Sequence, residues 1–426
     1  MVLKQIYKYL CPQKIQQSII TRKLYNQSKE KIESTFLHYE DVLKNVQKKK
    51  VLSFGSYVVY DSTFGAAGLM DILLQEKEKY SVKFVIIPDV SRGLEHMVSQ
   101  YKNTKKFFLD KYGEAFVLDG YDIENQQFLD NSSLFDLVYM ANPYDSMVNH
   151  LHSVDYMSTQ NLLPIHINYC FQPDKYSNTH IMQRLELSLF WKVFAETTFT
   201  YKDYKTYEII HGRNVVLSGY AKMDELAKID PCIKQDKKTI IIAPHHTINN
   251  GLLPLSNFDK YADFFLKLPD LYPNINFIFR PHPLLFTTLI KEGVWTNEKV
   301  EEYITELREK NVYYSTGGDY FKIFAESDAI IHDCSSYIVE YLFTKKPGCF
   351  MAKKDNKQYL NQLGIKCLKY YTKAFDQKDI ISFIESVNRE EKINRKRLDK
   401  FLKNNISINY PNVSKFIYEE LNKIHN

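Results

Sequence analysis

The sequence predicts an α/β protein with two Rossmann-like domains, each a doubly wound parallel sheet with helices on both faces. Three observations support this prediction. The chain has 426 residues, more than a single hydrophobic core usually serves. Short apolar runs alternate with helical stretches along most of the chain, as βαβ units require. The alternation is interrupted by the polar, proline-containing stretch AKIDPCIKQDKK, which separates the two halves.

The first half begins with a basic segment and continues as the first domain. Residues 1–49 are expected to form a helical leader, and residues 50–226 the N-terminal Rossmann-like domain. Four apolar runs in this domain are predicted to be strands because they are bounded by turn residues and separated by helical patterns. They are KVLSFGSYVVYD (50–61), SVKFVIIPD (81–89), FDLVYMANP (135–143) and LLPIHINYCF (162–171).

The second half repeats the pattern after a linker at residues 227–238. Residues 239–377 are predicted to form a C-terminal Rossmann-like domain, and residues 378–426 two C-terminal helices split by ISINYPN. The expected strands are TIIIAPHH (239–246), INFIFRPHP (275–283), NVYYST (311–316), DAIIHDCSS (328–336) and PGCFM (347–351). The cleft between two such domains is the expected site.

Charge is concentrated at the start of the chain. Residues 1–50 carry eleven Lys and Arg against four Asp and Glu, so this segment has a net charge of +7 and the remainder −2. Such a segment indicates an anionic partner, with a solvated helix packed on the body as the alternative. The stretch LKQIYKYLCPQKIQQSII mixes Lys with Ile, Leu and Tyr, a composition suited to a lipid surface.

The sequence indicates a cytoplasmic protein. The N-terminus lacks the apolar core of a signal peptide, and no apolar run approaches the ~18 residues that span a bilayer. The six cysteines have no CxxC spacing, which argues against a zinc site or a disulfide framework and for a reducing compartment. We therefore expect a protein that contacts the inner face of the membrane peripherally, through residues 1–50.

Residues that bind anions follow three of the strands predicted in the second half. In open parallel sheets, ligands bind beyond the carboxyl ends of the strands. Imidazole, guanidinium and hydroxyl groups that converge there indicate a phosphorylated ligand. The residues concerned are His245 and His246, then Arg280 and His282, then His332, Asp333, Ser335 and Ser336.

Each of these features has a plainer interpretation as well. The serines of HDCSSYIVEYLF could simply cap a helix, or the helix start could bind phosphate. Glu340 could lie on a solvated helix face, or reach ribose hydroxyls as acidic residues do in dinucleotide sites. The prolines of RPHP could end an edge strand, or hold His282 rigidly. The convergence favours the functional interpretation for the serines and for His282. A metal site at the histidines is not expected, because it would need further ligands in matching geometry.

Several common functions lack their motifs. No GxxxxGK[ST] loop is present, so P-loop kinases and ATPases are excluded. The fragment GSYVVYDSTFGAAG does not match GxGxxG, which argues against a nicotinamide cofactor. No RNA-binding or helix-turn-helix signature is found, and no nucleic-acid partner is expected.

Five segments, in order, resemble the CDP-glycerol glycerophosphotransferase family, the teichoic-acid and capsule polymerases and primases. They are GYAKMDEL (219–226), APHHTI (243–248), FRPHP (279–283), SDAIIHDCSSYIVEY (327–341) and KKPGCFM (345–351). The resemblance covers about residues 215–355. It implies a GT-B-like fold and a transferase that moves glycerol phosphate, or a related polyol phosphate, from CDP to a hydroxyl of a polymer or lipid-linked acceptor. CMP would be released and no cofactor required.

The resemblance also implies that residues 50–226 hold the acceptor and residues 239–377 the CDP-activated donor, and it implies roles for the site residues. His282 would contact the donor diphosphate and support departure of CMP. Ser335 and Ser336 would hold phosphate oxygens, Glu340 the ribose, and Arg280 and Asp333 would shape the cleft, with His245 and His246 also on the donor side.

The sequence departs from the family pattern in its first half. Many members carry a WHG motif whose histidine is a candidate base, and here INYCF places Tyr169 at that position. A phenol with a pKa near 10 is a poor base at neutral pH. His166 could substitute, although on a strand it would face away from Tyr169. GYAKMDEL also replaces the commoner GYPRND.

Two other functions remain open at this point. One is a nucleotide-sugar glycosyltransferase of the same fold in capsule or lipopolysaccharide synthesis. The other, of a different class, is an inactive nucleotide-binding subunit of a polymer-synthesis complex, because the WHG motif is absent.

Overall fold

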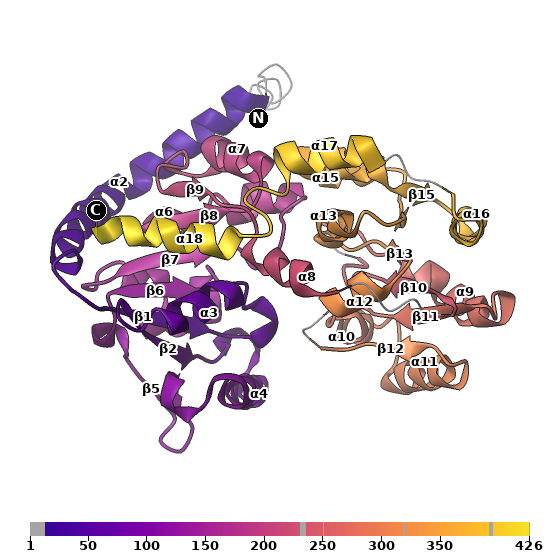
Figure 1. Ribbon diagram of the computed structural model, residues 1–426, viewed down its shortest axis with the longest axis horizontal. Helices are drawn as coiled ribbons and strands as arrows, with labels where there is room; N and C mark the ends of the chain where they lie inside the picture. Colours follow the sequence, from indigo (N-terminus) through magenta and orange to yellow (C-terminus); the bar gives the residue numbers. More distant parts are fainter. Residues whose placement is uncertain (1–12, 231–235, 250, 318–319, 392–394, 426) are drawn as a thin grey trace, which may run out of the picture. The chain divides into compact units, whose positions relative to one another are not determined.

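The computed structural model describes residues 13–230, 236–249, 251–317, 320–391 and 395–425 (Figure 1). The chain forms two compact units. Unit 1 contains the described residues before Phe171, together with Asn178–Asp224 and those from Ile408 onward. Unit 2 contains Phe171–Ser177 and Glu225–Ser407. Each unit is a parallel sheet flanked by helices, so the predicted fold class is confirmed.

The sheet of unit 1 has seven parallel strands in the order β3-β2-β1-β6-β7-β8-β9. The four strands predicted for this half are β1, β2, β6 and β7, and their side chains are almost all buried, as apolar runs covered on both faces should be. Three short strands were not predicted. The bounds are β1 Leu52–Val58, β2 Tyr80–Ile86, β3 Val117–Asp119, β6 Leu137–Met140, β7 Leu163–Ile167, β8 Lys192–Ala195 and β9 Val215–Leu217; a separate hairpin pairs β4 Tyr121–Asp122 with β5 Gln127–Phe128.

The α-helices that accompany this sheet are mostly short. They are α3 Ala67–Gln75, α4 Leu94–Tyr112, α5 Val154–Met157, α6 Leu185–Leu189 and α7 Thr198–Tyr207, and α8 Asp224–Lys228 begins at the last residue of this segment.

Helix α2, Gln13–Val46, contains the described part of the predicted basic leader. It buries a stripe of side chains spaced three or four residues apart, the period of one helix face. The stripe includes Thr21, Ile32, Thr35, Tyr39, Val42 and Val46. Tyr39, Val42 and Val46 belong to the main core of unit 1, and the Tyr39 hydroxyl donates to the Leu189 carbonyl. The leader is therefore an integral part of unit 1, and residues 1–12 lie outside the described residues.

Replacing Tyr39 with alanine is expected to lower the free energy of unfolding by about 3–5 kcal/mol, as truncation of a large buried aromatic side chain usually does. Leu37→Ala is the matched control, because Leu37 lies on the same helix with 64% of its side chain exposed. It should change stability by no more than about 0.5 kcal/mol. Urea unfolding of both variants measures the difference, and equal small effects would show that α2 is not part of the core.

The sheet of unit 2 has six parallel strands in the order β12-β11-β10-β13-β14-β15. The chain runs outward from β10 in one direction and then returns to begin again at β13, so the strand order reverses between these neighbours. Ligands of doubly wound sheets bind at this reversal, beyond the carboxyl ends of the strands. The bounds are β10 Lys238–Ala243, β11 Ile275–Phe279, β12 Tyr313–Tyr314, β13 Ala329–His332, β14 Gly348–Met351 and β15 Thr372–Ala374.

The helices of unit 2 follow its strands on both sides of the sheet (Figure 1). They are α9 Phe258–Leu271, α10 Leu285–Lys291, α11 Asn297–Glu309, α12 Phe321–Glu326, α13 Tyr337–Glu340, α14 Asn356–Tyr359, α15 Gln362–Cys367, α16 Gln377–Asn388 and α17 Arg395–Asn405. No helix in the described ranges combines the length and apolarity that a membrane crossing requires.

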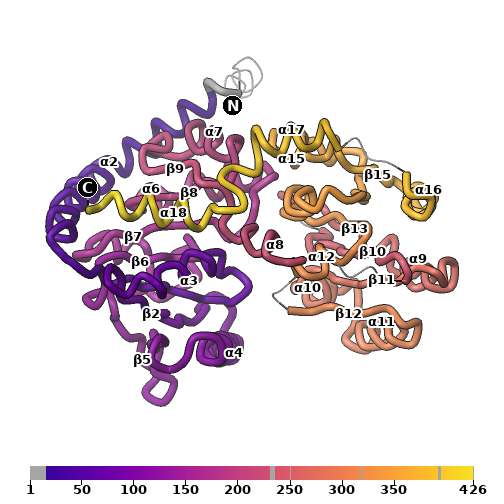
Figure 2. Tube along the Cα trace, viewed as in Figure 1, coloured from indigo at the N-terminus to yellow at the C-terminus, as the bar shows by residue number. Residues whose placement is uncertain are grey.

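The C-terminal segment differs from the prediction. It contains three α-helices instead of two, α16, α17 and α18 (Val413–Asn422), and ISINYPN separates the last two. Helix α18 packs beside α3 (Figure 2) and adds Val413, Ile417 and Leu421 to the core of unit 1. Asp224 accepts hydrogen bonds from the amides of Val413 and Ser414, 3.1 and 2.7 Å long. The chain thus returns to its first unit because α18 carries an apolar stripe that this core covers.

Candidate anion-binding site

The loops that follow β10, β11 and β13 lie next to one another at the strand-order reversal of unit 2. The amide of Arg280 donates to the Ile242 carbonyl at 2.8 Å, and the amide of His282 to the Pro244 carbonyl at 2.9 Å. These bonds extend the strand pairing of β10 and β11 into the two loops. The structure thereby brings together the loop residues that the sequence analysis placed on the donor side.

Arg280 is a buried cation with neutral partners. Its side chain donates from Nη1 to Ser315 Oγ at 2.7 Å and from Nη2 to the Gly317 carbonyl at 2.6 Å, and the guanidinium lies 5.2 Å from the centre of the Tyr320 ring. Arg280 is only 7% exposed, yet no Asp or Glu among the described residues forms an ion pair with it. A buried charge is costly unless a counter-charge compensates it. This arrangement is suited to an anionic ligand.

Three histidines lie beside one another at the same edge. The ring centres of His245 and His282 are 5.0 Å apart and those of His246 and His282 are 4.2 Å apart. One ring nitrogen of each residue lies within 4.8 Å of those of the other two. Burial, with repulsion from His246, lowers the pKa of His282 to about 3, and burial and the neighbouring histidines hold the pKa of His245 well below its usual range. Both rings are therefore neutral at pH 7.

The backbone determines which nitrogen of the His282 ring carries the hydrogen. Nδ1 of His282 accepts a hydrogen bond from the Leu284 amide at 3.1 Å, so Nε2 is the N–H donor of this neutral ring. Nδ1 of His245 lies 2.8 Å from the Thr247 hydroxyl and 3.3 Å from the Thr247 amide, and either nitrogen of His245 can carry the hydrogen. Histidines that bind a metal usually donate their second nitrogen to an acceptor, the reverse of the polarity at His282. His282 therefore suits an anion better than a metal ion.

Asp333 connects the loop after β13 to the loop after β10 by hydrogen bonds. Its carboxylate accepts hydrogen bonds from the amide of His245 at 2.6 Å and from the amide of Asn257, the residue before α9, at 2.7 Å. Burial raises the pKa of Asp333 to about 7. The side chain is fully buried, so Asp333 contributes by positioning the His245 loop.

The segment after β13 differs from the plain capping interpretation. Helix α13 is a single turn, Tyr337–Glu340, followed by a 3-10 turn at Tyr341–Thr344, so its dipole is small. Ser336 makes no capping hydrogen bond with its side chain, and the Ser335 hydroxyl donates to Asp174 at 3.0 Å. Neither serine caps the helix.

Glu340 does not lie on a solvated helix face. It is 1% exposed, and its Oε2 accepts a 2.5 Å hydrogen bond from the Tyr320 hydroxyl. Tyr320 in turn lies against the Arg280 guanidinium. Glu340 therefore supports the ring that packs on Arg280.

His166 and Tyr169 belong to unit 1, at the end of β7. His166 is 1% exposed, and its two nitrogens lie 2.9 Å from the Met140 carbonyl and 2.9 Å from Asn168 Oδ1. This leaves no ring nitrogen for an acceptor hydroxyl, so the substitution of His166 for the missing base does not fit the structure. Tyr169 is half-buried, with its hydroxyl 3.3 Å from that of Tyr144.

Several residues of the site were not singled out from the sequence. Ser315 and Tyr320 support Arg280, and Asp174 bonds Ser335. Ser315 follows the two-residue strand β12, and Tyr320 directly precedes α12. Asp174 lies more than 150 residues from its partner Ser335. Nothing in the local sequence pattern identified them.

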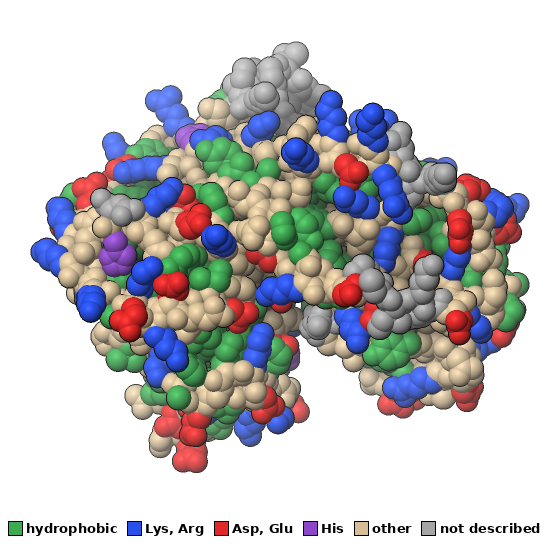
Figure 3. Space-filling model, viewed as in Figure 1, with side chains coloured by type: hydrophobic (Ala, Val, Ile, Leu, Met, Phe, Trp, Pro, Cys, Tyr) green, Lys and Arg blue, Asp and Glu red, His purple; other side chains and the backbone are tan. Residues whose placement is uncertain are grey.

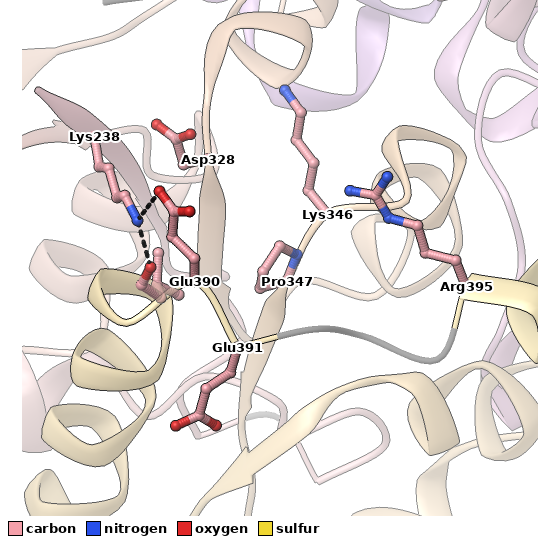
Figure 4. Close-up of a pocket in the computed structure, with 8 residues that line it drawn as sticks. Lys238, Asp328, Lys346, Pro347, Glu390, Glu391 and Arg395 are labelled. Carbon is pink, nitrogen blue, oxygen red and sulfur yellow. Dashed lines mark hydrogen bonds and ion pairs between the residues drawn. The ribbon is translucent and has the colours of Figure 1, made fainter. Parts of the chain in front are cut away.

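A separate hollow of about 560 Å³ opens at the opposite, amino-terminal edge of the same sheet (Figure 4). It is lined by Lys238, Asp328, Lys346 and Glu390, among others. Three carboxylates also line it, those of Asp328, Glu390 and Glu391, and Lys238 is paired with Glu390. Because these carboxylates repel an anion, the hollow suits an anion less than the carboxyl-terminal edge does.

Comparison with known families gives a match that begins in the first half and covers nearly all of the second half and the C-terminal helices. The model of the CDP-glycerol:poly(glycerophosphate) glycerophosphotransferase family matches residues 174–423. This range includes Asp174 and the three loops of the anion-binding edge. No curated protein sequence matches the chain.

Solved structures share the fold at low sequence identity. A variant of the wall teichoic acid polymerase TagF, soaked with CDPG, has a TM-score of 0.58 at 12% identity, covering 96% of this chain and 97% of its own. A UDP-N-acetylglucosamine 2-epimerase described as putative, from Listeria monocytogenes, has a TM-score of 0.53 at 11% identity, covering 88% and 96%. S. aureus MnaA with UDP has a TM-score of 0.51 at 14% identity, covering 87% of this chain and 96% of its own.

Proposed function

Since the chain belongs to the CDP-glycerol:poly(glycerophosphate) glycerophosphotransferase family, we propose that it transfers glycerol phosphate from CDP-glycerol to a hydroxyl of a growing polymer or a lipid-linked acceptor and releases CMP. The same site would also accept a CDP-activated donor that carries a related polyol phosphate. The diphosphate of the donor would lie at the carboxyl edge of the unit 2 sheet.

The observation that carries this proposal is the buried guanidinium of Arg280, with which no Asp or Glu of the described residues forms an ion pair, together with the histidines on the neighbouring loops. A CDP-activated donor has a diphosphate with several anionic oxygens. Arg280 would neutralise part of that charge, and the Nε2–H group of His282 would donate to a phosphate oxygen. Preorganised charge and hydrogen bonds of this kind account for much of the acceleration in phosphoryl transfer.

The reaction needs one bond to form and one to break. The acceptor oxygen attacks the phosphorus that carries glycerol, and the bond from this phosphorus to the bridging oxygen breaks. CMP leaves with that electron pair, and the proton of the acceptor hydroxyl passes to a base. His282 would stabilise the charge that develops on the leaving phosphate. Tyr169 remains the candidate for the base.

A donor screen tests the proposal. The purified protein is mixed with CDP-glycerol, CDP-ribitol, UDP-sugars or CMP-sugars and a polymer acceptor, and released CMP and UDP are measured. We expect CMP release with a CDP-polyol only. UDP release would identify a nucleotide-sugar glycosyltransferase, and binding of cytidine nucleotides without release from any donor would identify an inactive subunit.

We further propose that the enzyme works in the cytoplasm at the inner face of the cell membrane, where acceptors of this kind are extended. The support is the net charge of +7 over residues 1–50 and the exposed side chains of Ile19 and Ile20, 47% and 44% accessible, next to exposed Arg22 and Lys23 on α2. Exposed apolar and basic groups together favour an anionic lipid surface.

Reversing Arg22, Lys23 and Lys29 to Glu is expected to reduce binding to phosphatidylserine-containing vesicles by ~10²-fold or more at low salt, at about 1 kcal/mol per basic residue. Wild-type binding should also weaken as salt rises. Sedimentation with vesicles measures both effects. Because basic and acidic side chains are mixed on the face shown in Figure 3, the control reverses Lys102, Lys106 and Lys111 of α4, with the same change in net charge. Equal losses in both triple variants would contradict a contact made by α2.

A further inference from the structure

Ser335 is held by a carboxylate that is distant in the sequence. Its hydroxyl donates to Oδ2 of Asp174 at 3.0 Å. The other oxygen, Oδ1, accepts from the amide and the hydroxyl of Ser177 at 2.8 and 2.9 Å. Asp174 is 5% exposed, and none of the Lys or Arg residues that the structure describes forms an ion pair with it. The partners of this buried carboxylate are thus neutral hydrogen-bond donors, and Ser335 is one of them.

The segment Phe171–Ser177 is fixed on unit 2, which places Asp174 firmly. The Asn361 side-chain amide donates to the carbonyls of Gln172 and Asp174, 2.8 and 3.2 Å away, and the Asn361 backbone amide to that of Pro173 at 3.1 Å. Gly364 allows the close approach, because a side-chain carbon there would lie 2.3 Å from the Pro173 oxygen. The backbone that carries Asp174 is thereby fixed, and the two hydrogen bonds from Ser177 hold its carboxylate beside Ser335.

A serine hydroxyl has one hydrogen and two lone pairs. With its hydrogen directed to Asp174, Ser335 can offer a ligand only its lone pairs, so it accepts a hydrogen bond. To donate to a phosphate oxygen instead, the hydroxyl would have to leave a buried carboxylate oxygen without its partner. It would also bring a second anion close to that carboxylate, which like-charge repulsion opposes. Burial raises the pKa of Asp174, and the bonds from Ser177 and Ser335 oppose that shift by favouring the ionised form.

We propose that Asp174 is a positioning residue that turns the Ser335 hydroxyl so that Ser335 accepts a hydrogen bond from a hydroxyl group of the CDP-activated donor. The phosphate oxygens are left to Arg280 and the histidines. This assignment rests on the proposed function, and it replaces the expectation that Ser335 holds phosphate. The hydroxyl belongs either to the ribose or to the glycerol, which present the same chemistry.

Calorimetric titration of wild type, Ser335→Ala, Asp174→Asn and Asp174→Ala with CDP-glycerol, CDP and pyrophosphate tests the assignment. Ser335→Ala should weaken CDP-glycerol binding about five- to tenfold, the usual effect of one net hydrogen bond, and leave pyrophosphate binding unchanged. An equal loss with CDP assigns the ribose hydroxyl, and unchanged CDP binding assigns the glycerol hydroxyl. Ser386→Ala is the control for loss of a serine hydroxyl in unit 2.

Asp174 should act only through Ser335. Asp174→Ala should reproduce the Ser335→Ala loss without adding to it in the double variant, because the two residues form one unit. Asp174→Asn keeps an acceptor oxygen and should retain most of the affinity; it carries the test if the alanine variant does not fold. If Ser335→Ala weakens pyrophosphate binding as much as CDP-glycerol binding, the inference about Ser335 is overturned and the proposed function is not. Failure of the wild type to bind CDP-glycerol would overturn the proposed function itself.

Discussion

Replacing Arg280 with methionine is expected to reduce kcat/KM for the CDP-activated donor by ~10²- to 10³-fold, because it removes a preorganised charge from the diphosphate site. The same change should leave the melting temperature unchanged or raise it slightly. In the free protein Arg280 is 7% exposed and bonded to Ser315 and the Gly317 carbonyl. Because no Asp or Glu in the described part of the chain pairs with it, its burial costs stability that an apolar side chain of similar length recovers.

Two further variants separate the loss of charge at Arg280 from the general loss of an arginine. Arg280→Lys keeps the charge but not the planar fork that spans two acceptors, so it should recover only part of the activity. Arg308→Met, which removes an exposed arginine of α11, should change neither activity nor stability. Donor titrations and scanning calorimetry provide the two readouts. A strongly destabilised Arg280→Met protein with unimpaired donor binding would mean that Arg280 is a structural residue.

Replacing His282 with alanine is expected to lower the transfer rate by ~10²-fold or more with the fold intact, because the half-buried ring lies in a loop after β11. In the proposed reaction His282 donates a hydrogen bond from Nε2, because its Nδ1 accepts one from the Leu284 amide. His282→Gln, which can also donate from its side chain, should therefore recover part of the loss. A general base could not be replaced by an amide in this way.

Steady-state kinetics with saturating acceptor measure this effect. His180→Ala, at an exposed position of unit 1, is the control for the loss of a histidine. Turnover of His282→Ala within about threefold of the wild type would refute the assignment. No recovery at all in His282→Gln would favour a proton-transfer role.

The central strands of both sheets could be predicted from the sequence because they are buried on both faces and read as apolar runs. Strands β8, β9 and β15 could not, since KVFA, VVL and TKA are only three or four residues long and resemble loop segments. The C-terminal helices show a further limit. The stripe of Val413, Ile417 and Leu421 identifies α18 as amphipathic, but not which core covers it.

The proximity of Arg280, His245 and His282 could be predicted, because the carboxyl ends of parallel strands lie at one edge of the sheet. The direction of the His282 hydrogen bonds was not predictable, because it depends on where the Leu284 amide lies after folding. The surroundings of His166 were not predictable for a related reason. A histidine in a strand reveals nothing of the carbonyl and amide oxygens that occupy both of its nitrogens.

The mass of the acceptor after reaction is the most direct test of the central claim that this edge binds a CDP-activated polyol phosphate for transfer. The wild-type enzyme, CDP-glycerol and a short synthetic poly(glycerol phosphate) acceptor are incubated, and the acceptor mass and the released CMP are measured in the same sample. We predict one added glycerol phosphate unit for each CMP released, and neither product with Arg280→Met over the same period. An acceptor that gains a sugar from a nucleotide-sugar donor, or CMP release without any gain in acceptor mass, would contradict the account.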